Sequence, residues 1–248
     1  YNTHYLGFNA NMLANEMFLD SASLRSSVVS HAKMLGYEVA SPRAPVATIN
    51  VSLITSNATA TMPAGTTFTT KVDGINYKFV TVEDVTKQNT GNFIPFDSTE
   101  IYEGTYATTK YVVDSNDVDQ RFMLTDVRAD TSTLRVRVQN SSTDTTTTTY
   151  TKATDITQLS SSSTVYYLQE TESGKFEVYF GDGATSVAVS DGNIVTLNYV
   201  ITNKTLANGA SVFTSPGAID TVTNVNVVTV SNAAGGSEPE TISSIKLN

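Results

Sequence analysis

Side chains able to bind a metal ion gather in one acidic segment of the sequence, Asp114-Ser115-Asn116-Asp117-Val118-Asp119. A calcium-binding loop places its oxygen ligands at alternate positions, with glycine at the sixth position and a bidentate glutamate at the twelfth. Here the sixth position is Asp119 and the twelfth is Thr125. Because the pattern fails where it is most specific, we predict a solvated acidic turn and no metal site.

Two other segments carry residue types used in catalysis or phosphate binding. Gly181-Asp182-Gly183 has the glycines of a phosphate loop, but no lysine or helix pattern follows it, and this favours a hairpin or a bulge. Ser27 and His31 lie four residues apart on a predicted helix, without the Gly-x-Ser-x-Gly motif of a nucleophile elbow. We therefore predict that His31 is a polar residue of a helix face.

The composition excludes several classes of function. The 248 residues include no Cys and only two His, which removes disulfides, thiolate chemistry and His-rich metal sites. The net charge of −9 disfavours nucleic-acid binding, and no apolar run reaches the roughly 20 residues that span a bilayer. We predict no catalytic residue, no cofactor, no metal, and neither nucleic acid nor membrane as a partner. Only 16% of residues are charged, and Thr and Ser are abundant, as in many virion or extracellular β-proteins.

The elements that would position these residues begin with helices. Apolar residues recur at helical spacing in two segments, predicting helices at about 3–19 and 22–35, with Gly36 at the C′ position of the second. Pro42 and Pro45 then mark a linker. The apolar stripe of these helices has two interpretations: it is part of the chain's own core, or it belongs to a separate arm that docks on other subunits.

The rest of the chain has the period of β-strands. Ala47, Ile49, Val51 and Leu53 alternate with polar residues, and Asp73-Gly74 predicts a hairpin turn between 66–72 and 75–82. Further strands are expected at 105–113, 120–127, 133–139, 164–169, 175–180, 193–200 and 219–231. The run Thr145 to Thr149 indicates an exposed strand or loop. Ser237 and Glu240 match a capping box, which predicts a helix from residue 238.

These patterns predict an α+β fold that is mainly β, with an N-terminal helical arm followed by two or more antiparallel β-rich domains. We expect the arm at 1–41 and the first part of a β-domain at 42–94. An inserted β-rich domain is expected at 95–160, the second part of the β-domain at 161–234, and the start of a truncated C-terminal region at 235–248. The absence of an initial Met and the helix pattern at the end suggest a fragment.

Blocks along the whole chain resemble the baseplate wedge subunits of T-even-like contractile-tailed bacteriophages, within the baseplate J-like family. The N-terminal blocks are Tyr1-Asn2-Thr3-His4-Tyr5-Leu6, Asn15-Glu16-Met17-Phe18-Leu19 and Ala32-Lys33-Met34-Leu35-Gly36-Tyr37. Three later blocks follow in the same order: Met62-Pro63-Ala64-Gly65-Thr66-Thr67-Phe68, Val178-Tyr179-Phe180-Gly181-Asp182-Gly183 and Gly235-Gly236-Ser237-Glu238-Pro239-Glu240-Thr241-Ile242. The segment 95–160 matches least.

The resemblance implies a structural subunit and no enzyme. In such phages two copies of this subunit combine with another wedge protein through their N-terminal helices, and a C-terminal region, expected to be missing here, joins neighbouring wedges. The implied location is the tail baseplate of the virion, assembled in the host cytoplasm. The subunit interface would then include Leu6, Met12, Leu13, Met17, Phe18, Leu24 and Val28.

Two other functions remain open at this point. A β-rich virion or secreted adhesin would expose an aromatic cluster or an acidic calcium site at its loop tips to bind a glycan or receptor. A polysaccharide-degrading enzyme would need a cleft with two carboxylates about 5–10 Å apart, one of them holding a proton. The sequence contains 24 acidic residues and does not single out such a pair.

Overall fold

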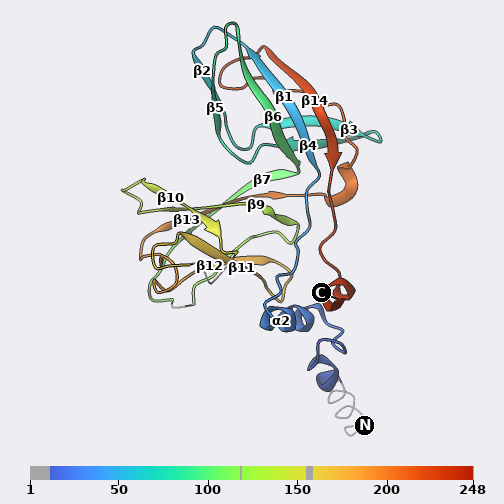
Figure 1. The fold of residues 1–248 in the computed structure, drawn as a ribbon, viewed down its shortest axis with the longest axis vertical. Helices are drawn as coiled ribbons and strands as arrows, with labels where there is room; N and C mark the ends of the chain where they lie inside the picture. Colours follow the sequence, from blue (N-terminus) through green and yellow to red (C-terminus); the bar gives the residue numbers. More distant parts are fainter. Residues whose placement is uncertain (1–11, 118, 155–158, 248) are drawn as a thin grey trace.

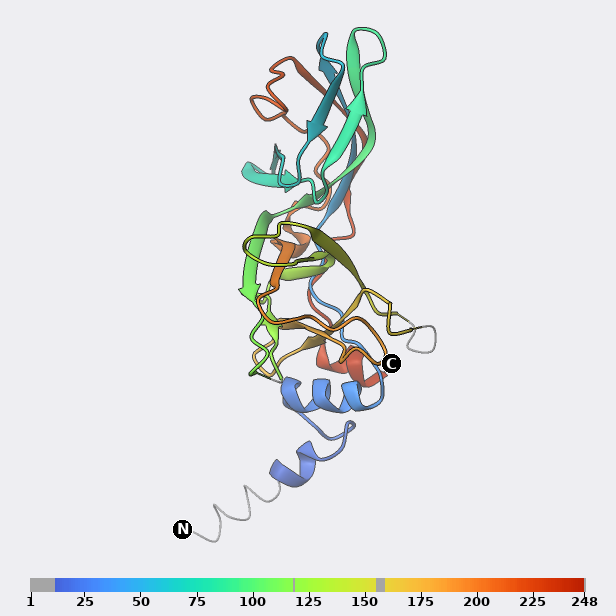
Figure 2. The ribbon, with the colours of Figure 1, turned by 90° about the vertical axis from the view of Figure 1, so that its left-hand side faces the viewer.

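The computed structural model describes residues 12–117, 119–154 and 159–247 (Figure 1). The chain is mainly β, as predicted, with a five-stranded sheet, a seven-stranded sheet and a two-stranded ribbon. The strands of the two large sheets form two β-bodies, one above the other in Figures 1 and 2, and helices α2 (Arg25–Met34) and α3 (Ile242–Leu247) lie below the lower body.

The first β-body is built on the five-stranded sheet, in which all neighbouring strands are antiparallel. Ala47, Ile49, Val51 and Leu53 are fully buried in its core, so the predicted alternation is confirmed. The sheet has the order β14-β1-β6-β4-β3, and the ribbon pairs β2 with β5. Their bounds are β1 (Val46–Ile54), β2 (Thr59–Met62), β3 (Thr67–Val72), β4 (Ile75–Val80), β5 (Val85–Gln88), β6 (Phe93–Glu103) and β14 (Val225–Ala234).

The hairpin between β3 and β4 turns at Asp73 and Gly74, as predicted. Both residues have positive φ, 48° and 85°, which is the backbone that a two-residue type I′ turn requires. The last strand of this sheet starts later than the predicted residue 219. Ile219 and Val222 instead exchange backbone hydrogen bonds with each other in a tight turn, and β14 begins at Val225.

The second β-body is built on the seven-stranded sheet, with the order β7-β13-β9-β10-β11-β12-β8. Leu134, Val136 and Val138 point into its core, as expected. The strand predicted at 120–127 is only two residues long. β10 and β11 are parallel, whereas the other neighbours are antiparallel. The bounds are β7 (Thr105–Val112), β8 (Phe122–Met123), β9 (Ala129–Gln139), β10 (Thr147–Lys152), β11 (Val165–Glu170), β12 (Phe176–Phe180) and β13 (Ile194–Ile201).

The helical end contains a helical segment at 12–16, helix α2 (Arg25–Met34) and helix α3 (Ile242–Leu247). Residues 1–11 of the predicted first helix lie outside the described part of the chain. Helix α2 ends as expected: Gly36 has a φ of 80°, and the N–H of Tyr37 donates to the carbonyl of Ala32 in a Schellman arrangement.

The capping box predicted at Ser237 and Glu240 is wrong. Ser237 exchanges backbone hydrogen bonds with Arg43, and the Glu240 carboxylate accepts from the Tyr37 hydroxyl and the Ala40 N–H. The helix begins later, at Ile242, and the Thr241 hydroxyl accepts from the N–H of Ser244 as its N-cap. Tertiary contacts with the linker therefore displace the local capping pattern.

The two β-bodies meet at a junction with its own small core. Ala44, Val80, Val82 and Val200 form a buried cluster there. The fully buried Glu103 carboxylate accepts hydrogen bonds from the Thr202 hydroxyl, at 2.8 Å, and from the main-chain and side-chain N–H groups of Asn203. The chain passes between this first body and the rest at 43–46, 103–105, 201–204 and 234–237.

Division of the chain into domains remains a prediction. The predicted boundaries lie at 94/95 and 160/161. The hydrophobic cores follow another grouping, in which strands β7 to β13 contribute to one core. The 3₁₀ helix η2 (Lys204–Ala207) follows β13, and its last residue, Ala207, is buried in the core of the first β-body.

A substitution at Gly104 tests how tightly the junction is packed. Gly104 joins β6 to β7 at a φ of 131°, and a Cβ at this position would lie 2.2 Å from the Ile201 carbonyl oxygen. We expect Gly104→Ala to lower the free energy of unfolding by more than about 3 kcal/mol. Denaturant titration measures this change. Gly217→Ala is the control, since a Cβ at Gly217 meets nothing within 4 Å. Equal midpoints for the two variants would contradict a tight junction.

Candidate functional site

The helical end exposes an unusual number of large apolar side chains. Leu13, Met17 and Phe18 are 67–70% exposed, and Met12 and Leu24 are 42% and 49% exposed. Sequence reasoning missed two more, Met34 and Leu35 at the end of α2, which are 72% and 74% exposed. For Leu35 the available signal was the apolar periodicity of 22–35, to which it belongs. We call these residues the exposed helical set: Met12, Leu13, Met17, Phe18, Leu24, Met34 and Leu35.

The elbow between the helical segment at 12–16 and α2 is fixed by Glu16. Its carboxylate accepts hydrogen bonds from the N–H and hydroxyl of Ser23, at 2.8 and 2.7 Å, and from the N–H of Leu24. The Ser23 N–H, with the hydroxyls of Ser27 and Ser23, lowers the pKa of Glu16 to about 2. The side chain of the N-cap residue Leu24 cannot accept a hydrogen bond from the backbone at the start of α2. The Glu16 carboxylate supplies a hydrogen-bond acceptor there instead.

Helix α2 is itself held against the body by a small core. Val28, Val29 and Ala32 are buried together with Val39 and with Ile245 of α3. Val28 was predicted to lie in the subunit interface, but the chain's own residues already cover it completely. We therefore leave Val28 out of the interface proposed below. Leu6 lies outside the described residues.

An ion pair ties α2 to the second β-body. The Arg25 guanidinium donates to both carboxylate oxygens of Glu170, with distances of 2.7 and 2.9 Å, and the Glu170 side chain is only 2% exposed. Lys33 of α2 also donates to Gln169 on the same strand. A bidentate Arg–carboxylate pair fixes orientation as well as distance. The exposed helical set is therefore connected to the body through a positioned helix.

The structure assigns local roles to the polar candidates of the sequence. His31 Nε2 lies 2.8 Å from the Glu16 carbonyl oxygen, so His31 joins the two helical segments. The Asp114 carboxylate accepts from the N–H and side-chain amide of Asn116, which lower its pKa. The described residues contain no group of three His, Asp or Glu side chains placed to hold a metal ion.

The glycine segment after β12 is not a hairpin, because β12 and β13 are not neighbours in the sheet. Gly181 is needed for a close approach: a Cβ there would lie 2.0 Å from the Oγ atom of Ser186. The hairpin prediction failed because the segment connects two strands that are separated by three others in the sheet.

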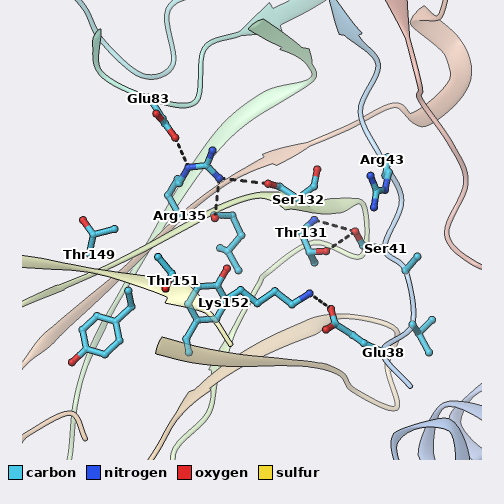
Figure 3. A pocket seen from close by; sticks show the side chains of 15 residues that line it. Glu38, Ser41, Arg43, Glu83, Thr131, Ser132, Arg135, Thr149, Thr151 and Lys152 are labelled. Carbon is cyan, nitrogen blue, oxygen red and sulfur yellow. Dashed lines mark hydrogen bonds and ion pairs between the residues drawn. The ribbon is translucent and has the colours of Figure 1, made fainter. Parts of the chain in front are cut away.

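A cavity with a volume of about 670 Å³ lies between the linker and β9–β11 (Figure 3). Its two carboxylates are both ion-paired: Glu83 lies 2.8 Å from the Arg135 Nε atom, and Glu38 pairs with Lys152. Within the described ranges, no helix combines the length and apolar character needed to cross a membrane.

Comparison with known proteins gives a family match over part of the chain. Residues 110–214, which include most of the second β-body, match the family model of the third domain of the bacteriophage baseplate wedge protein gp6. The resemblance to baseplate wedge subunits is thereby confirmed in a segment that includes most of 95–160, the part of the sequence that resembled them least.

One particular relative is the baseplate wedge protein gp6 of Enterobacteria phage T4. It is 29% identical over 278 aligned positions, which cover 99% of this chain and 40% of the relative. The chain thus spans about two fifths of the length of that protein. The similarity supports a structural role in the baseplate and the predicted location in the virion tail.

The Glu16 elbow gives a testable pH dependence. Because the folded-state pKa, about 2, lies below the ordinary 4.5, the stabilisation is fully present above pH 4.5 and is lost as pH falls toward 2. Glu16→Gln imitates the protonated form at neutral pH. We expect faster amide hydrogen exchange at Ser23 and Leu24 in this variant, and unchanged exchange in the exposed control Glu172→Gln. Unchanged exchange in Glu16→Gln would show that the elbow does not depend on the carboxylate.

Proposed function

We propose that the chain is a structural subunit of a baseplate wedge and assembles through the exposed helical set. The observation that carries the proposal is the exposure of large apolar side chains on and next to helical segments whose own positions are fixed by Glu16 and Arg25. Large apolar side chains exposed together at one end of a molecule are typical of protein–protein contact sites.

The partners follow from the resemblance to wedge subunits. We propose that the helices pack with those of a second copy and of another wedge protein, and that neighbouring wedges are joined through a further C-terminal region. Full burial of one such side chain contributes roughly 1.5–3 kcal/mol, so three or four of them supply much of the affinity of a stable complex.

We also propose that the chain catalyses no reaction. A glycosidase needs one carboxyl group that holds a proton beside a second carboxylate. In the 670 Å³ cavity Glu38 and Glu83 do not face each other as such a pair, because each is ion-paired with a cation, Lys152 and Arg135 respectively.

A substitution of two exposed residues tests the homodimer. We expect the full chain to self-associate in sedimentation experiments and Leu13→Ser/Phe18→Ser to weaken this by about 100-fold or more. Both side chains are exposed, so thermal unfolding should be little changed. Val212→Ser removes an equally exposed valine, 74% accessible, from the first β-body and is the control. A monomeric full chain, or equal association of all variants, would contradict a homodimer through this surface.

A further inference from the structure

The 670 Å³ cavity lies where two neighbouring strands separate. β10 pairs with β9 only as far as Tyr150, opposite Val136, and from Thr151 onward it pairs with β11 instead. β9 continues beyond this point without β10 as its neighbour. The two strands therefore open like a fork, with the linker 38–43 along the other side of the opening (Figure 3). We call this opening the fork cavity.

Main-chain acceptors of β9 face this space without a strand partner. The carbonyl oxygens of Leu134 and Ser132 lie 3.2 and 3.5 Å from the Nη1 atom of Arg135, whose own side chain is the donor. On its opposite edge β9 pairs with β13, and the register of this pairing shifts between Asn198 and Val200. Each carbonyl oxygen has a second lone pair, so an added strand can still donate to it.

The charges around the fork cavity favour an anionic group. Arg135 and Lys152 are neutralised by Glu83 and Glu38, respectively. Arg43 also lines the cavity, and among the described residues its guanidinium makes no hydrogen bond or ion pair, although its backbone pairs with Ser237. Two of the three cations that line the cavity are paired with its two carboxylates, so Arg43 leaves a local positive charge that complements a carboxylate.

We propose that the fork cavity binds an extended acidic segment of a partner protein. The segment's main chain hydrogen-bonds to the β9 carbonyls, as in strand addition, and a carboxylate side chain pairs with Arg43. The volume lies within the range of cavities that enclose ligands of a few residues. This site is separate from the exposed helical set, and its test does not depend on association through the helices.

The probe is a fluorescein-labelled, acetylated peptide, Thr-Val-Asp-Val-Thr, titrated with the full chain and followed by fluorescence polarisation. We expect a dissociation constant below about 1 mM and roughly tenfold weaker binding when the peptide's Asp is replaced by Asn. A peptide methylated on its backbone nitrogens should lose binding, because it cannot donate to β9. Succinate at the same concentration should not displace the labelled peptide.

Variants of the chain locate the contact. Arg43→Gln should reduce binding of the Asp peptide about tenfold and so remove its advantage over the Asn peptide, whereas Lys71→Gln, which removes an exposed cation elsewhere, should keep the advantage. Circular dichroism confirms that both variants are folded. The proposal is overturned if no peptide binds at about 1 mM, if Asp and Asn peptides bind equally, or if Arg43→Gln leaves the difference intact. Displacement by succinate would overturn strand addition in favour of a free carboxylate site.

Discussion

The structure depends on a buried carboxylate that must keep all its hydrogen bonds. Glu103 is fully enclosed at the junction of the two β-bodies, and its donors come from the segment that follows β13, about a hundred residues later in the chain. A charge removed from water is tolerated only where such donors replace the solvent. The end of β6 and the end of β13 are therefore fixed relative to each other, and Asp130 similarly accepts from the Ala44 N–H of the linker.

Local sequence patterns predicted much of the β-structure because their causes are local. The alternation in β1 and the Asp73-Gly74 turn depend on the period of a strand and on the φ values of adjacent residues. The junction could not be predicted in this way, since nothing near Glu103 indicates that Thr202 and Asn203 will surround it. The same reason explains why the helix starts later than predicted, at Ile242. The Glu240 carboxylate accepts a hydrogen bond from the Ala40 N–H of the linker, which lies far away in the sequence.

The candidate site was predicted in part. Apolar periodicity identified Met12, Leu13, Met17, Phe18 and Leu24, which are exposed, but it could not separate them from Val28, which is buried on the same helical pattern. The difference comes from tertiary packing, since Val28 lies in a buried cluster that includes Val39 and Ile245, a residue more than two hundred positions away. Exposed and buried members of one apolar stripe are thus distinguished only by tertiary packing. The fork cavity had no sequence signal, because it arises from a change of strand partner.

The repeated passage of the chain through the junction has a mechanical consequence. The segments 43–46, 103–105, 201–204 and 234–237 run between the first β-body and the rest, and Arg43 and Ser237 link the first and last of them by two hydrogen bonds. A pulling force on one body is therefore shared among several covalent paths in parallel, and torsion about any single path is opposed by the others. Any rotation of one body against the other therefore has to deform all four segments together.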